Sequence, residues 1–440
     1  MLRAPMHSIR PLRQLSSDDA ATIHRFFDTS PISPSGKYAA LFELPQEDHR
    51  PNPGETGSVV VRNLETDTEV WRMETAAWDT QLGAQVQWGR SDTELLFNLI
   101  DPETWVPYGV VANFETNELK TLPGTVYMAE SVNGRIVSPC LRRIARVQPG
   151  YGVIVPEAFC PQNSGFSDED GVTLIDPDAG TAQLIASVGD IVRALPEAFA
   201  KLDVTAGAMY TFHTKWNEQG DRLMVVLRWI REDQGRALSD SCLVTMRPDG
   251  SDIHLAISFD DWRGGHHPNW CPDGTHIVMN LRDSSVRKSF RKAKRFMQKA
   301  TNKLALARKL GLRYYSNIER LHLTRFKYDG SAREILAPGC VGSGHPSLSG
   351  AQDHVLTDAY LRESPAYADG TVPIRWVDMA SATEQEIVRI GSKPKILGPK
   401  NCLRIDPHPA WSRDGKSIAF NGTLGGKRQV FALDMSELLS

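Results

Sequence analysis

One spacing pattern recurs along this 440-residue chain and limits its fold more than any other feature. Its clearest copy, GGHHPNWCPDGTHIVMN, spans residues 264–280. The pattern predicts a short strand over 268–271, a tight turn at PDG, where glycine supplies backbone freedom, and a returning strand over 276–279. We number the positions of this unit from His267, which is position zero, so that Asn280 is position thirteen.

The same spacing fits six other stretches of the chain. Four are close copies, and two, which begin at Thr29 and Tyr127, are weaker. The seven position-zero residues are Thr29, Gln85, Tyr127, His213, His267, His345 and His408. Four of them are histidine, although the chain contains only 12 histidines. This enrichment indicates that position zero has a shared purpose.

Each unit is followed by two more alternating runs separated by a polar turn. These runs begin at Ser58, Tyr108, Gly171, Cys242, Leu321, Ile374 and Gln429. Four antiparallel strands repeated seven times predict an all-β fold, a seven-bladed β-propeller of four-stranded blades that forms a single domain over residues 1–440. The last repeat stops near its third strand, so we expect the segment from Ile9 to Leu15 to supply the missing outer strand and close the ring.

Propeller geometry predicts where the position-zero residues meet. The first strand of each blade lines the central channel, so these residues should surround one mouth of it. Insertions after the second strands should form walls of that mouth. The segment 101–107 contributes Trp105, and the segment 141–163 contributes Arg142, Arg143, Gln148 and Tyr151. We take Arg143 and Tyr151 as candidate catalytic residues, and the candidate substrate-binding residues are Trp105, Arg142, Gln148, Lys215 and Tyr360.

A third insertion, in blade five, predicts a basic amphipathic helix over about 284–311. Its apolar residues follow helical spacing, and its other surface carries many lysines and arginines. Such a helix packs against the propeller or forms a homodimer through its apolar face. As an alternative, its charge attracts an anionic ligand to the mouth. Nucleic-acid binding is disfavoured, because only this stretch is basic and the formal net charge is -3.

Several features place the chain among cytoplasmic proteins. No apolar run has the length of a signal peptide or a membrane span, so we expect neither secretion nor a membrane partner. The six cysteines are dispersed without the paired spacing of a redox or metal motif.

Converging neutral imidazoles suit either a divalent metal site or acid–base chemistry. Gln85 would add an oxygen ligand. Asn98, Asn280, Asp358 and Asn421 recur at position thirteen, where they would either orient the imidazoles or cap turns. A site of histidine, arginine, tyrosine and a metal suits proton abstraction next to a carboxylate, as in β-elimination of uronic-acid glycans. The sequence has no serine-nucleophile elbow and no phosphate-binding glycine loop.

The W-x-P-D-G turns, including WSRDG at Trp411, resemble those of TolB-type propellers. The glutamine-rich stretch WDTQLGAQVQWG at residues 78–89, together with the ring histidines, is similar to the propeller polysaccharide lyases, above all oligogalacturonate lyase and more distantly the ulvan lyases. This resemblance implies a lyase for anionic uronate oligosaccharides that uses a divalent metal, with Mn²⁺ favoured and Ca²⁺ as the alternative.

The resemblance also implies roles for individual residues. His345 and His408 correspond to metal ligands. His267 corresponds to a third ligand or to the base, and His213 is the other candidate base. The family has a glutamine and an H-x-H cluster in its last blade, whereas this chain reads RIDPHPAWS and offers His408 there. Two other functions remain as alternatives: a propeller glycoside hydrolase acting on a glucuronate-linked sugar, and a non-catalytic TolB-type binding module.

Overall fold

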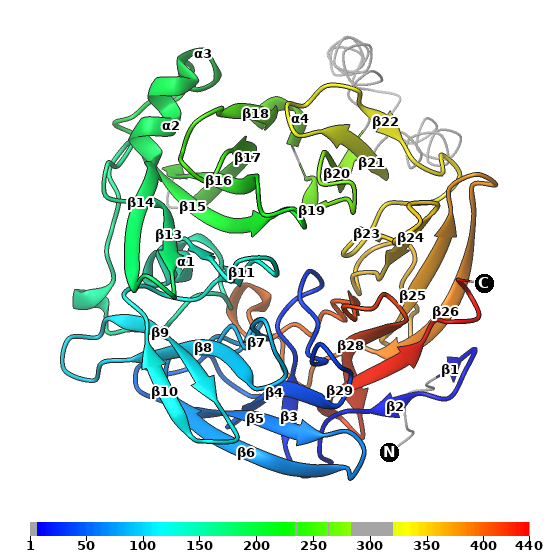
Figure 1. Ribbon diagram of the computed structural model, residues 1–440. Helices are drawn as coiled ribbons and strands as arrows, with labels where there is room; N and C mark the ends of the chain where they lie inside the picture. Colours follow the sequence, from blue (N-terminus) through cyan, green and yellow to red (C-terminus); the bar gives the residue numbers. More distant parts are fainter. Residues whose placement is uncertain (1–6, 234–235, 263, 283–319, 440) are drawn as a thin grey trace.

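The computed structural model describes residues 7–233, 236–262, 264–282 and 320–439. Its named strands form antiparallel sheets, five with four strands and one with nine. Figure 1 shows these sheets arranged in a ring around a common centre, which is the arrangement of a β-propeller. The helix predicted over 284–311, and the homodimer through it, lie outside the described residues.

Each of the five four-stranded sheets is built from consecutive strands. The first contains β3 (Ala21–Ile23), β4 (Tyr38–Leu44), β5 (Gly57–Asn63) and β6 (Thr68–Thr75). The second contains β7 (Gln87–Trp88), β8 (Glu94–Ile100), β9 (Pro107–Asn113) and β10 (Glu118–Thr121). The third contains β11 (Met128–Ala129), β12 (Ile136–Ser138), β13 (Gly171–Asp176) and β14 (Thr181–Ser187). The fourth contains β15 (Gly207–Trp216), β16 (Leu223–Asp233), β17 (Arg236–Met246) and β18 (His254–Ile257). The fifth contains β19 (His266–Trp270), β20 (His276–Arg282), β21 (Leu321–Lys327) and β22 (Glu334–Ile335).

The nine-stranded sheet contains two four-stranded groups and one extra strand. One group is β23 (Ser347–Leu348), β24 (His354–Thr357), β25 (Thr371–Asp378) and β26 (Thr383–Gly391), with β1 (His7–Ser8) paired to β26. The other is β27 (Ala410–Trp411), β28 (Ser417–Leu424), β29 (Lys427–Asp434) and β2 (Arg13–Gln14). A single residue pair, Gly391 with Thr423, joins the two groups.

The N-terminal segment supplies the outer strand of the last group, as the sequence predicts. In β2, Arg13 pairs with Ala432 and Gln14 pairs with Phe431 of β29. Leu15 follows with a backbone hydrogen bond to Val430 and a buried side chain. The two ends of the chain are therefore joined within one sheet, which satisfies an otherwise open edge.

The first sheet differs from the prediction made for it. Its inner strand is β3, which pairs with the end of β4, and the chain then leaves the sheet over residues 24–31. It returns with one bridge, Ile32 to Ala39. The weak copy that begins at Thr29 therefore starts after the inner strand and not at its beginning. In Figure 1 part of the blue N-terminal chain lies in the middle of the ring.

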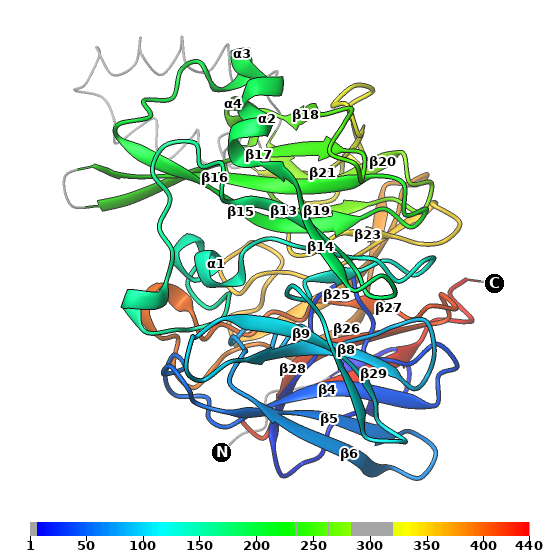
Figure 2. The same ribbon diagram turned by 60° about the vertical axis from the view of Figure 1, so that its left-hand side comes forward.

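Short helices occupy the connections between strands. They are α1 (Leu141–Val147), η1 (Glu157–Phe159), α2 (Val188–Ala194), α3 (Pro196–Phe199), α4 (Phe259–Trp262) and η2 (Pro399–Asn401). A capping box of Ser187 and Asp190 begins α2. Figure 2 shows α2 and α3 at the outer edge of the molecule, whereas α1 lies in the predicted insertion over 141–163. No helix among the described residues is long and apolar enough to cross a membrane.

The tryptophans at position three explain why the spacing recurs. Trp88, Trp216 and Trp270 are buried between neighbouring sheets. The indole of Trp88 donates to the carbonyl of Pro31 (2.7 Å), and that of Trp270 donates to the carbonyl of Lys215 (3.3 Å). Each contact links one sheet to the preceding one. A tryptophan suits this place because its large ring fills the space between sheets, and in Trp88 and Trp270 its N–H also finds a backbone partner.

Candidate active site

The ring histidines meet at the centre of the molecule. The ring centroids of His267 and His345 are 3.9 Å apart, and those of His345 and His408 are 4.3 Å apart. The imidazole of His213 stacks against the ring of Phe26, with ring centroids 5.2 Å apart. Side chains separated by more than 190 residues thus share one small volume, because equivalent first strands all face the channel.

The backbone at three of these positions is strained. Gln85, His267 and His408 have φ values of 61°, 59° and 50°, in a region that residues with side chains rarely adopt. Such residues each cost about 1–3 kcal/mol and persist where the surrounding structure fixes them. The same strain at equivalent positions of three repeats indicates that the inward direction of these side chains is maintained at the expense of stability.

The position-thirteen residues tie each sheet to the next. Asn98 bonds to Val126, Asn280 donates to the carbonyl of Gly344 (2.9 Å), and Asp358 accepts the backbone N–H of His408 (3.1 Å). These partners lie at or beside the next position zero. Of the two roles considered for position thirteen, orientation of a ring imidazole applies to Asp358, which also accepts a hydrogen bond from Nδ1 of His345 (2.9 Å).

This rule reveals a fifth ring histidine that the sequence spacing does not find. Asn421 accepts the backbone N–H of His24 (2.9 Å), so His24 takes the place in the first sheet that His408 takes in the last. Both ring nitrogens of His24 are buried without a hydrogen-bond partner. Burial lowers its pKa to about 4, so the imidazole is neutral near pH 7.

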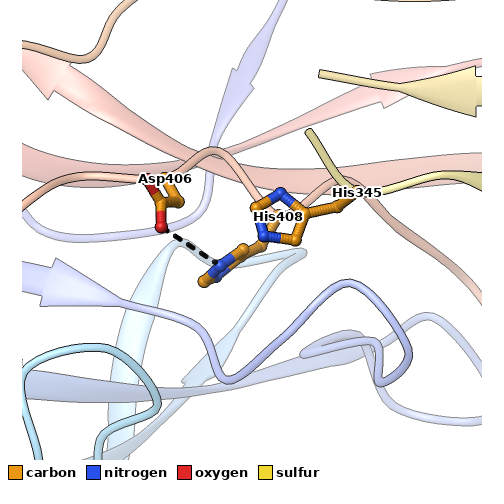
Figure 3. A group of neighbouring side chains, drawn as sticks. All are labelled: His345, Asp406 and His408. Carbon is orange, nitrogen blue, oxygen red and sulfur yellow. Dashed lines mark ion pairs between the residues drawn. The ribbon is translucent and has the colours of Figure 1, made fainter. Parts of the chain in front are cut away.

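His345, Asp406 and His408 form a group whose candidate ligand atoms all lie within 4.8 Å of one another. Figure 3 shows the Asp406 carboxylate directed at the His408 ring, with the His345 ring beside it. Both nitrogens of His408 and Nδ1 of His267 have no hydrogen-bond partner, although they are buried. Unpartnered buried nitrogens around a carboxylate fit a divalent cation, because imidazole and carboxylate are both common ligands.

The protonation of these groups suits the same role. Burial, together with neighbouring imidazoles, lowers the pKa of His267 and of His408 well below 6.5. Both rings are therefore neutral and have lone pairs to donate. Asp358, which holds Nδ1–H of His345, leaves Nε2 of that ring directed away from the carboxylate. An outer carboxylate that fixes the tautomer of a ligating histidine is a common feature of metal sites.

Asp406 is in turn held by Arg404. The guanidinium Nε donates to Asp406 at 2.7 Å, and an Nη of the same group donates to the hydroxyl of Tyr151 at 2.8 Å. Burial raises the pKa of Tyr151 to about 12, so its phenol is protonated. The two hydrogen bonds of Arg404 connect the candidate metal group to the wall of a neighbouring pocket.

A pocket of about 300 Å³ opens beside the ring histidines. Of the residues predicted for the site, it brings together His213, His267, Gln148, Tyr151 and Tyr360. It also contains three cationic side chains, Arg228, Lys400 and Arg404, and no carboxylate among the described residues that line it. Its electrostatic character therefore favours an anionic ligand.

Two tyrosine–histidine contacts shape this pocket. The Tyr360 hydroxyl lies 2.5 Å from Nε2 of His267 and 3.5 Å from Nε2 of His345. The Tyr127 hydroxyl bonds to Nδ1 of His213. Burial, with the cations of Lys215 and Arg228, lowers the pKa of His213 well below 6.5, so this imidazole is neutral as well.

Two cations of the pocket, Arg228 and Lys400, have no carboxylate partner among the described residues; Arg228 is half-buried, whereas Lys400 is exposed. Arg228 lies in β16, the second strand of the fourth sheet, donates to Oε1 of Gln148 (2.5 Å) and lies over the ring of Phe212. Burial lowers its pKa to about 10, which still leaves it charged at neutral pH. A half-buried, unpaired guanidinium is a suitable partner for a carboxylate ligand.

Three of the predicted wall residues, Trp105, Arg142 and Arg143, do not line this pocket. Arg142 donates to the carbonyl of Phe159 (3.0 Å), Arg143 approaches Glu169 at 3.9 Å, and Trp105 packs against Phe159. These three side chains therefore make contacts outside the pocket. Gln148 and Tyr151, which belong to the same insertion as Arg142 and Arg143, reach the pocket.

Gln85 and Lys215 lie in the centre of the channel with partners of their own. Oε1 of Gln85 accepts a hydrogen bond from Arg25 (3.0 Å). The Lys215 ammonium pairs with Asp28 (2.8 Å), and the side chains of Lys215 and Asp28 are almost fully buried. Gln85 is therefore not part of the group around His408. Lys215 is directed at the protein and away from the pocket, whose lining does not include it.

Sequence reasoning missed five residues of this centre: His24, Phe26, Arg228, Arg404 and Asp406. A signal existed for Asp406, which lies two residues before position zero in RIDPHPAWS. The repeat spacing does not identify the other four residues. His24 and Phe26 lie in the segment 24–31, which leaves the first sheet, and Arg228 and Arg404 lie at positions that differ between repeats.

Comparison with solved structures supports the β-propeller fold. No protein-family model and no curated protein sequence matches the chain. Among solved structures, oligogalacturonate lyase in complex with manganese superposes with a TM-score of 0.58 at 13% identity, covering 98% of this chain and 97% of that one.

A second oligogalacturonate lyase, from Vibrio parahaemolyticus, superposes with a TM-score of 0.57 at 11% identity, covering 99% and 98% of the two chains. TolB from Acinetobacter baumannii matches over 91% of this chain and 78% of its own, with a TM-score of 0.37. The resemblance to oligogalacturonate lyase expected from the sequence is therefore present in the fold.

Proposed function

We propose that this protein is a metal-assisted lyase that cleaves uronic-acid-containing oligosaccharides by β-elimination. The observation that carries the proposal is a cationic pocket, with no carboxylate among the described residues that line it, which opens beside a group of neutral, partly unpartnered histidines. We also propose that the two groups of the nine-stranded sheet are separate blades, which gives seven. The expected cytoplasmic location and the absence of a nucleic-acid partner stay predictions.

His345, His408 and Asp406 would hold the cation. His267, whose ring centroid lies 3.9 Å from that of His345 and whose Nδ1 is unpartnered among the described residues, would be a further donor. Two imidazoles and a carboxylate favour a transition metal such as Mn²⁺ over Ca²⁺, which takes oxygen ligands. When bound, a divalent cation would neutralise the substrate carboxylate and so acidify the adjacent C–H bond.

The protein's own residues would supply the remaining steps. Arg228 would pair with a substrate carboxylate. His213, with Nδ1–H directed to Tyr127, would use Nε2 to remove the proton from the carbon next to the carboxylate. The electrons of that C–H bond form the new double bond as the adjacent glycosidic C–O bond breaks. The Tyr360 hydroxyl would donate a proton to the departing oxygen.

The test is an incubation with oligosaccharides of galacturonate, glucuronate, mannuronate and guluronate, with added MnCl₂ or after chelation. Ultraviolet absorbance reports the conjugated double bond of the product. We expect it for at least one substrate, only with metal, and strongly reduced in Arg228→Ala. Arg142→Ala, which removes an arginine outside the pocket, is the matched control and should keep activity.

The alternative functions give different results in the same experiment. New reducing ends without the double bond would indicate a glycoside hydrolase on a glucuronate-linked sugar. Glycan or protein binding without any product, unaffected by His213→Ala, would indicate a binding module. Either result overturns the lyase proposal.

A further inference from the structure

Arg25 and Phe26 are consecutive residues in the segment 24–31, which leaves the first sheet after β3. Together they contact the position-zero residues of all six other repeats. Phe26 is fully buried and touches the four histidines. The distances from its ring centroid are 5.2 Å to His213, 6.1 Å to His267, 5.7 Å to His345 and 4.7 Å to His408. A single aromatic ring thus forms the common packing surface of imidazoles from four repeats.

Arg25 serves the two remaining repeats. Its Nε donates to Oε1 of Gln85 (3.0 Å), and one Nη donates to the backbone carbonyl of Tyr127 (2.5 Å). Its guanidinium also lies 5.1 Å from the centre of the Tyr127 ring. Because the Tyr127 hydroxyl bonds to His213, Arg25 also acts on the proposed base through that tyrosine.

A buried ion triad holds these two residues in place. Asp28 pairs with Arg25 (2.7 Å) and with Lys215 (2.8 Å), and all three side chains are at most 2% exposed. Lys215 lies two residues after His213 in β15 and donates to the carbonyl of Pro268, next to His267. Burial opposes ionisation of Asp28, but Lys215 and Arg25 lower the pKa of this carboxyl overall, so the triad stays charged.

We propose that Phe26 is a positioning residue that fixes the ring histidines for metal binding and catalysis, with Arg25 and the Asp28–Lys215 pair as its anchor. Asp358 holds the imidazole of His345, but both nitrogens of His408 and one of His267 have no hydrogen-bond partner among the described residues. Packing against Phe26 is therefore the contact that these rings share. The catalytic consequence rests on the proposed lyase function, whereas the effect on the imidazoles does not.

The test compares Phe26→Leu with Phe420→Leu. Phe420 is equally buried, but its ring stacks on Phe431 in the last sheet and not on a ring histidine. Titration with MnCl₂ in a calorimeter should show affinity reduced roughly 10- to 100-fold in Phe26→Leu, the range found when support of a ligating histidine is lost, and little changed in Phe420→Leu. At saturating metal, kcat should fall more than KM rises.

A metal-free measurement completes the experiment. In protein labelled with ¹⁵N-histidine, Phe26→Leu should shift the imidazole signals of the ring histidines, whereas Phe420→Leu should leave them in place. If Phe26→Leu does not fold, Phe26→Met, which is close in volume, replaces it.

Identical imidazole spectra and Mn²⁺ affinities in the two variants would overturn the inference. If wild-type protein cleaves no uronate but the variants still differ in Mn²⁺ affinity or imidazole signals, the proposed function fails and the positioning role stands. If wild-type protein binds no Mn²⁺, the imidazole signals decide.

Discussion

At the scale of single residues, Asp358 connects two of the ring histidines, His345 and His408. It accepts hydrogen bonds from the backbone and Nδ1 of His345 and from the backbone of His408. Asp358→Asn should weaken Mn²⁺ binding roughly 10- to 100-fold, because the amide no longer fixes the His345 tautomer. Asp353→Asn removes the exposed partner of His354 and should leave the affinity unchanged. Calorimetry measures both, and equal affinities would contradict the proposed orienting role of Asp358.

The Lys215–Asp28 pair gives a second prediction at this scale. Lys215→Met leaves a buried carboxylate with one cation fewer, so unfolding free energy should fall by about 3–5 kcal/mol. Arg193→Met removes an exposed pair with Asp168 and Asp190 and should cost much less, because solvent screens surface ion pairs. Urea unfolding measures both variants. A cost for Lys215→Met no larger than that of the control would show that the pair is not an anchor.

At the scale of elements, the strand that closes the ring is the most informative. Leu15 follows β2 and packs in a core cluster with Ala419 and Val430 of the last sheet. Leu15→Ala should therefore destabilise the protein by about 2–5 kcal/mol, as expected for a buried leucine. Leu439→Ala, at an exposed site, is the control. A loss as small as the control's in urea unfolding would mean that β2 contributes little to closing the ring.

The sequence predicts the regular elements well because each repeat meets the same packing demand. Strands, turns and the N-terminal closing strand follow from alternation and from the spacing of tryptophan, glycine and asparagine. The sequence did not predict the course of the segment 24–31, because this segment leaves its sheet. Its partners are the position-zero residues of other repeats. No local pattern encodes such contacts. His24 was hidden for the same reason.

At the scale of the whole molecule, the buried imidazoles set the pH dependence of stability. Burial lowers the pKa of His24 from 6.5 to about 4, and it also lowers those of His213, His267 and His408. Between these values and 6.5 the unfolded chain binds protons that the folded chain does not. The contribution of each histidine is thus complete above pH 6.5 and is lost as the pH falls. Asp79, whose pKa burial raises to about 7, acts in the opposite direction.

Burial also raises the pKa of the Asp170 and Glu218 carboxyls, which act in the same direction as Asp79. The four buried histidines outweigh these three carboxyls, so metal-free protein should become less stable from pH 7 to pH 5. His24→Gln removes one titrating group and should reduce the slope by at most about 1.4 kcal/mol per pH unit, since one pKa unit corresponds to about that energy. Urea unfolding at several pH values measures the slope. An unchanged slope in His24→Gln would show that His24 is not held neutral by burial.

The whole site could be predicted only in part. The convergence of His267, His345 and His408 follows from equivalent positions in a ring, which is a property of the repeat. The cations of the pocket and the carboxylate of the metal group, Arg228, Arg404 and Asp406, come from positions where the repeats differ, and only the three-dimensional structure places them together.

The most direct test of the central claim is the position of a bound metal. Crystals equilibrated with MnCl₂ should show one anomalous peak at the manganese edge, in contact with His345, His408 and Asp406. A peak elsewhere, or none at these side chains under conditions in which the protein remains folded, would contradict the assignment of this centre as the metal site of a lyase.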